Sequence, residues 1–99
     1  MIDWTKITGF DWDEGNTRKN EKHGVTMAEA EQLFFNAPLL VLEDSKHSDQ
    51  QPRFHALGKT DDSRLLHITF TVRHNREKVR VISARDMHRK ERAIYEKAT

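Results

Sequence analysis

The feature that most constrains the fold of this chain is the strict alternation of apolar and polar side chains over residues 66–73. The apolar positions are Leu66, Ile68, Phe70 and Val72, and those between them are His67, Thr69, Thr71 and Arg73. Successive side chains of a β-strand point to opposite faces of the sheet, so this pattern predicts a strand with one buried face. The sequence therefore predicts a sheet that is packed on one side and open on the other.

The segments around this strand complete an α+β fold in a single domain, 1–99. Strands are predicted at 7–12, 39–43, 53–60 and 78–85, and helices at 13–22, 26–37 and 86–97. Thr26 and Glu29 have the spacing of a capping box, and Asp86 is the expected cap of the last helix. Short turns separate the later strands. We therefore expect an antiparallel sheet of about five strands, with two helices after the first strand and a C-terminal helix.

Composition narrows the cellular setting and the chemistry. Of the 99 residues, 33% are charged and 35% are hydrophobic, and there is no cysteine. The lack of cysteine excludes disulfides, a thiol nucleophile and thiolate metal sites. The sequence has neither an apolar run long enough for a membrane span nor the pattern of a secretory signal. We expect a cytoplasmic protein with no membrane partner.

Charge is distributed unevenly along the chain. Residues 1–50 carry five Lys or Arg against ten Asp or Glu, a net charge of −5. Residues 51–99 carry twelve against six, a net charge of +6. This asymmetry indicates an anionic partner for the second half.

Arginines surround the apolar strand 80–85. Strict alternation predicts that Arg80 shares a face with Ile82 and Ala84 and that Arg85 points to the other face, at the end of the strand. Arginine presents a rigid fork of donors that fits phosphate, so the strand is a candidate phosphate-binding surface. The alternative, a strand flanked by solvated charges, explains the same residues equally well.

Motifs for other chemistries are missing. The sequence contains no pair of helical histidines around a glutamate, no glycine-rich phosphate loop and no nucleophile elbow, so we expect no metal and no cofactor. His55 and His67 could meet across a hairpin, although exposed strand histidines are the commoner arrangement. What remains is metal-free cleavage of RNA by its own 2′-hydroxyl. Arginines would stabilise the charge on the phosphate and a histidine would transfer protons.

Motifs along almost the whole chain resemble the BrnT family, the ribonuclease toxins of bacterial type II toxin–antitoxin pairs. The matching residues are Phe10-Asp11-Trp12-Asp13, Asn20, Lys22-His23-Gly24-Val25, Glu29-Ala30, Phe34, Pro38-Leu39, Glu43-Asp44, His47, Arg53, Gly58, Thr71, Arg73, Arg80, Ile82-Ser83-Ala84-Arg85, Glu91-Arg92 and Tyr95. The resemblance implies a RelE-like ribotoxin fold and arrest of translation by RNA cleavage without metal. It also implies an antitoxin partner of the BrnA type, with a ribbon-helix-helix DNA-binding domain.

Candidate site residues follow from these two lines of reasoning. Arg80 and Arg85 are expected to contact the scissile phosphate, Arg53 and Arg73 to line the same basic face, and His47 to transfer a proton. The expected RNA-binding residues are Asn20, Lys22 and His23 from the first helix, with Lys59 and Arg89.

The alternative function is a non-catalytic module that binds RNA or an acidic protein through the same face. A small-molecule enzyme is the weakest hypothesis. The resemblance favours the nuclease, whose basic face an acidic antitoxin segment would mask.

Overall fold

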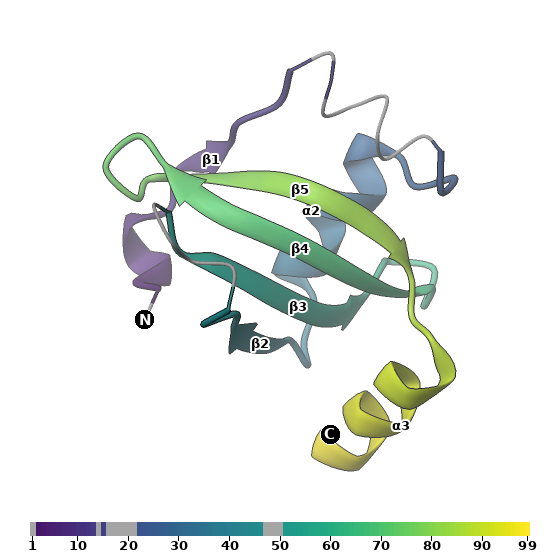
Figure 1. The fold of residues 1–99 in the computed structure, drawn as a ribbon. Coiled ribbons are helices and arrows are strands. Elements are labelled where there is room, and N and C mark those ends of the chain that lie inside the picture. The colour runs from purple at the N-terminus through teal and green to yellow at the C-terminus, as the bar shows by residue number, and fades with distance from the viewer. Residues whose placement is uncertain (1, 14, 16–21, 47–50) are drawn as a thin grey trace.

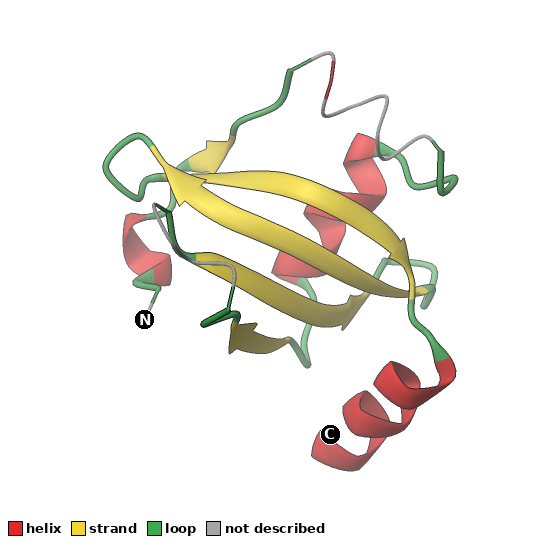
Figure 2. Cartoon of the chain, viewed as in Figure 1, coloured by secondary structure: helices red, strands yellow, loops and turns green. Residues whose placement is uncertain are grey.

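A computed structural model describes residues 2–13, 15, 22–46 and 51–99 of the chain. The elements in chain order are a 3-10 helix η1 (Trp4–Lys6), β1 (Gly9–Phe10), α2 (Met27–Phe35), β2 (Leu40–Glu43), β3 (Arg53–Lys59), β4 (Leu65–Arg73), β5 (Lys78–Asp86) and α3 (Arg89–Ala98) (Figure 1). The helix expected over 13–22 falls mostly outside the described residues. Figure 2 shows the resulting α+β architecture, with one sheet, α2 behind it and α3 beyond one end.

The five strands form one sheet in the order β1-β5-β4-β3-β2. Strands β2 to β5 are joined as the antiparallel meander that the sequence predicts. The prediction of a wholly antiparallel sheet is wrong, because β1 pairs with β5 in parallel, with Gly9 opposite Lys78 and Phe10 opposite Val79. The sheet is therefore mixed. This edge pairing is only two residues long, and no periodic pattern could reveal its direction.

Helix α2 covers one face of the sheet and encloses the main core. Thr26 caps the helix, and it exchanges hydrogen bonds with Glu29 in the capping box that the sequence predicts. Leu33 of α2 packs on Gly58 of β3 so closely that a Cβ at Gly58 would lie 2.8 Å from the Leu33 Cγ. The apolar side chains Leu66, Ile68, Phe70 and Val72 of the central strand are buried in this core, as predicted. The polar side chains between them, His67, Thr69 and Thr71, are buried as well, so the prediction of a single buried face is wrong for this strand.

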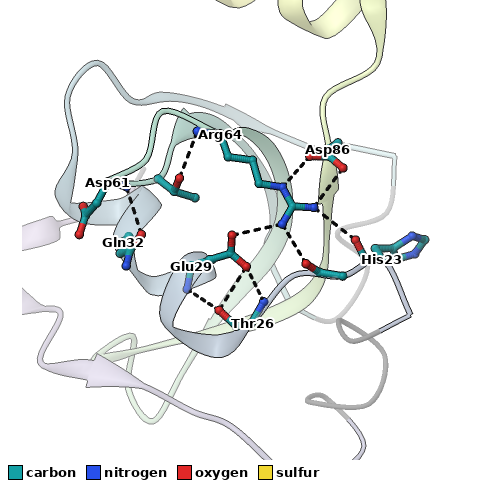
Figure 3. A network of polar contacts seen from close by, with 9 residues as sticks. His23, Thr26, Glu29, Gln32, Asp61, Arg64 and Asp86 are labelled. Carbon is teal, nitrogen blue, oxygen red and sulfur yellow. Dashed lines mark hydrogen bonds and ion pairs between the residues drawn. The ribbon is translucent and has the colours of Figure 1, made fainter.

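Arg64 joins the start of α2 to the end of β5 (Figure 3). Its Nε and Nη2 donate to the two carboxylate oxygens of Asp86 at 2.7 and 3.0 Å. Its Nη1 donates to the Gly24 carbonyl at 2.8 Å and to the Glu29 carboxylate at 3.2 Å. This pairing draws Asp86 into β5, opposite Leu66. The prediction that Asp86 caps the last helix is therefore wrong.

Helix α3 begins at Arg89, after His88 at the N-cap position. The Glu91 carboxylate accepts the His88 backbone N–H at 2.9 Å. Tyr95 is buried, and its hydroxyl donates to the Pro38 carbonyl at 2.6 Å. A second small core forms where α3 meets the sheet, from Leu57, Met87 and Tyr95 with Leu40 and Leu65 packed against them. Among the described residues no helix is both long and apolar enough to cross a membrane.

A bulge in β5 changes which side chains share a face. Thr69 pairs with Ser83 and Phe70 pairs with Val81, so Ile82 is an extra residue between them. Directly opposed residues in an antiparallel pair point to the same face. Arg80 is opposite Thr71 and Arg85 is opposite His67, and these two partners lie on one face of β4. The prediction that Arg80 and Arg85 lie on opposite faces is therefore wrong.

Candidate active site

The face of the sheet opposite α2, here called the open face, collects most of the polar strand residues. The strand register places on it Leu40 and Leu42 from β2; Arg53, His55, Leu57 and Lys59 from β3; Leu65, His67, Thr69, Thr71 and Arg73 from β4; and Lys78, Arg80, Ser83 and Arg85 from β5. Figure 1 shows this face uncovered across the middle of the sheet, with α3 at one end. The open face is thus the surface where strand-borne cations and imidazoles come together.

The cations form a row across the strands. Thr71 lies between Arg53 on one side and Arg80 on the other, and Arg73 with Lys78 forms the next row. The prediction that Arg53 and Arg73 share a face is consistent with this register. The Arg80 guanidinium is already engaged, since its Nη2 contacts the Asp13 carboxylate and its Nη1 lies 3.4 Å from Asp11 Oδ2. The hydrogen bond to Asp13 raises the pKa of Arg80.

Arg85 is held differently, by α3. Its two terminal nitrogens donate to the two carboxylate oxygens of Glu91 at 2.7 and 2.8 Å. Side-chain exposure is 26% for Arg85 and 20% for Glu91. The Arg85 hydrogen bonds, helped by the His88 backbone N–H, lower the pKa of Glu91 to about 2. The pair therefore fixes the first turn of α3 to the end of β5.

Two histidines occupy the open face between these arginines. His55 Nδ1 lies 3.1 Å from His67 Nε2 and 3.1 Å from Thr69 Oγ1, and the two imidazole rings stack with centroids 5.0 Å apart. His55 Nε2 lies 2.8 Å from Asp44 Oδ2. Burial, with smaller contributions from neighbouring cations, lowers the pKa of His67 to about 4. His67 is therefore neutral at physiological pH.

A cleft on the open face is lined by these histidines and by α3. It has a volume of about 370 Å³. Its lining residues are Leu42, His55, Leu57, His67, Arg85, Glu91 and Ile94. The cleft opens on the same face as Arg53 and Arg80, one to two side-chain rows away along the strands. Within the described part of the chain, no group of three or more His, Asp or Glu is placed to hold a metal ion.

The remaining predicted residues are spread over the molecule. Lys59 ends β3 on the open face, and Arg89 is exposed at the start of α3. Lys22 and His23 are exposed in the turn before α2, where the His23 carbonyl accepts from Arg64 Nη2 at 3.4 Å. They are not among the residues that line the cleft. Asn20 and His47 lie outside the described residues.

Sequence reasoning did not select His55, His67 or Glu91 as site residues. The signal for the histidines was present, because both belong to the polar parity of a hairpin whose turn lies at 60–63. Their register depended on the exact turn length, however, so the two could only be described as possible neighbours. Glu91 was visible as part of the family motif, but nothing in its spacing connected it to Arg85.

A family model described as the ribonuclease toxin BrnT of type II toxin–antitoxin systems matches residues 12–91. The chain belongs to the BrnT family. Among curated proteins no relative matches the chain.

Membership assigns the function at the level of the family: a ribonuclease toxin of a type II toxin–antitoxin system, with an antitoxin partner and an RNA target. The matched residues begin after β1 and end in the first turn of α3, and they include every strand residue of the open face. It does not favour the alternative of a non-catalytic binding module.

Proposed function

We propose that the open face is where this BrnT toxin binds and cuts RNA. The observation that carries the proposal is the β5 bulge, which brings Arg80 to the face that already holds Arg53 and Arg73. Guanidinium groups on neighbouring strands can bind adjacent oxygens of one phosphate, and a rigid sheet holds them in place before the substrate arrives. Helix α2 leaves this face accessible to a nucleic acid strand.

The reaction that fits these groups is attack of the RNA 2′-hydroxyl on the adjacent phosphorus. The 2′-oxygen forms a bond to phosphorus, the bond from phosphorus to the 5′-oxygen breaks, and a 2′,3′-cyclic phosphate and a 5′-hydroxyl result. One group accepts the 2′-proton and another donates a proton to the leaving 5′-oxygen. Arg53, Arg73 and Arg80 would stabilise the charge on the phosphate without a metal ion, and His47 is the proposed proton-transfer residue. Lys59, Lys22, His23, Asn20 and Arg89 are proposed to contact the RNA outside the scissile phosphate.

Binding at Arg80 requires an exchange of anions. In the structure the Arg80 guanidinium is paired with Asp11 and Asp13, so an RNA phosphate would have to replace at least the Asp13 carboxylate, the more exposed of the two. Arg85 stays among the proposed site residues, with its guanidinium shared between Glu91 and the cleft. The exchange makes RNA binding sensitive to the charge of the segment before α2.

The partner and the fold details complete the proposal. The antitoxin is proposed to be a BrnA-like protein with a ribbon-helix-helix domain, and the toxin to share the RelE-like ribotoxin fold and to act in the cytoplasm. An inhibitor that covers the open face would bring acidic groups to Arg53, Arg73 and Lys59. The mixed sheet with α2 on one face and an open opposite face is compatible with this arrangement.

The test is RNA cleavage by purified protein in the presence of EDTA. Arg53→Ala and Arg80→Ala should each cut on the order of a hundredfold more slowly, since a charge-assisted contact made in the transition state is worth about 3 kcal/mol. The matched control is Lys6→Ala, an exposed cation on η1 at the α2 side of the sheet. Wild-type rates in both arginine variants, or rates that depend on added metal, would overturn the proposal.

A further inference from the structure

The cleft between the open face and α3 has a chemistry different from that of the arginine row. Its floor is the stacked pair His55 and His67, and its sides include Leu42 of β2 and Ile94 of α3. The Leu42 and Ile94 side chains are large, apolar and half exposed, at 52% and 50%. Apolar and aromatic side chains with a few polar groups are the usual lining of a ligand-binding site.

The charges around the cleft are compensated. Arg85 is paired with Glu91, and His55 contacts Asp44. His67 is 9% exposed and neutral, and its Nδ1 has no hydrogen-bond partner among the described residues. Within the cleft the Arg85 cation and the Glu91 carboxylate therefore offset each other. The cleft offers the imidazoles of His55 and His67 and, at the Arg85–Glu91 end, hydrogen-bond donors and acceptors.

The distance between cleft and arginine row suits a nucleotide. His55 is two residues from Arg53 on the same face, and His67 is four residues from Thr71. Each pair of residues along a strand spans about 7 Å, so the histidine floor begins about 7 Å from the row that would hold the phosphate. The volume of about 370 Å³ lies at the lower end of the range for small-molecule pockets, which suits one ring system.

We infer that this cleft is a nucleobase subsite, which holds the unstacked base of a nucleotide next to the scissile phosphate on the His55–His67 floor between Leu42 and Ile94. The inference rests on the proposed use of the open face for RNA. Single-stranded RNA is commonly recognised by bases that leave the stack and pack on aromatic side chains, histidine included. The cleft would thereby set which nucleotide can stand beside the cut.

Direct binding tests the subsite independently of cleavage. Imidazole proton signals of His55 and His67 are followed by NMR while a nucleoside 5′-monophosphate is added, with ribose 5-phosphate and inorganic phosphate as ligands that lack the base. The inference predicts saturable shifts of both histidines with the nucleotide and much smaller shifts with the two base-free ligands. Equal shifts with all three ligands, or none with the nucleotide, would overturn it. This result stands even for a protein that cuts no RNA, so it separates failure of the subsite from failure of the proposed nuclease face.

Cleavage specificity provides the second measurement. RNAs that differ in one nucleotide beside the cleavage site, one of them abasic there, are compared for kcat/KM. The wild type should cut the abasic RNA about tenfold more slowly than the preferred one, and Leu42→Ala with Ile94→Ala should reduce that ratio towards one. Phe35→Ala, a 79% exposed apolar side chain on α2, is the matched control and should keep the wild-type ratio. If the double variant keeps the ratio and loses affinity for the antitoxin instead, the cleft is a protein-docking site and the inference is wrong.

Discussion

Replacement of Glu91 by Gln tests how α3 is attached to the sheet. The Glu91 carboxylate receives two hydrogen bonds from Arg85 and one from the His88 backbone, and these lower its pKa from 4.5 to about 2. One pKa unit is worth about 1.4 kcal/mol, so the ionised form stabilises the fold by roughly 3 kcal/mol at neutral pH. Glutamine keeps the shape and part of the hydrogen bonding. We expect Glu91→Gln to lower the free energy of unfolding by about 2–3 kcal/mol at pH 7.

The pH dependence of this stabilisation follows from the direction in which folding shifts the pKa of Glu91. A carboxyl group whose pKa is depressed by folding stabilises the protein above its unfolded pKa and loses that effect as the pH falls through the folded value. The window here runs from 4.5 down to about 2. At pH 3 the contribution of Glu91 should fall to roughly 1 kcal/mol, so the difference between wild type and variant should shrink by more than half.

Urea unfolding at pH 7 and at pH 3 measures the loss of stability at each pH. An unchanged m-value would show that the wild type and the variant unfold in the same kind of transition. Glu96→Gln is the control, because Glu96 is exposed on the same helix. It should change the free energy of unfolding by less than about 0.5 kcal/mol. A Glu91→Gln variant with wild-type stability at pH 7, or with the same loss at both pH values, would refute the role assigned to the Arg85–Glu91 pair.

Three further predictions concern other charged groups. Arg64→Ala should lower the free energy of unfolding by about 2–3 kcal/mol in urea, since it removes bonds to two carboxylates and to the backbone before α2, whereas Arg64→Lys should recover part of the loss. Burial lowers the pKa of His67 in the folded protein to about 4, so between pH 6.5 and about 4 the unfolded chain binds the proton first and the wild type loses stability. His67→Leu should remove this loss, which a series of Tm measurements between about pH 4 and 7 checks. Asp13→Asn should tighten binding of a 2′-deoxy RNA analogue several-fold by reducing competition for Arg80, and unchanged affinity in a titration would contradict the proposed exchange.

Most of the fold could be predicted from the sequence because the meander has strong local patterns. The alternation over 66–73 identified the buried face of the central strand, and the capping box at Thr26 identified the start of α2. Two features had no local signal. The parallel partner of β1 depends on a crossover between distant segments, and Asp86 resembles a helix cap until Arg64 is known to bind it.

The candidate site was predictable as a set of residue types but not as an arrangement. Every second residue on a regular strand shares a face, and by that rule Arg80 and Arg85 should separate. The extra residue Ile82 shifts the alternation by one, so each residue of β5 before it points to the face opposite to the one that strict alternation predicts. Bulges carry little sequence signature in an apolar strand, since the extra side chain is as hydrophobic as its neighbours. For the same reason the sequence left open whether His55 and His67 are neighbours across the hairpin, because a shift of one residue in the pairing would separate them.

The bulge brings Arg80 and Arg85 to one face, but their partners give them different tasks. Asp13, the partner of Arg80, is about half exposed, and water or an RNA phosphate can replace it at modest cost. Glu91, the partner of Arg85, is only 20% exposed and has its pKa lowered to about 2, so separating that pair costs more. An incoming phosphate should therefore exchange onto Arg80 and leave Arg85 bound to α3, where the Arg85–Glu91 pair forms one end of the cleft. Enhanced RNA binding in Asp13→Asn together with lost stability in Glu91→Gln is the combination that this division of roles requires.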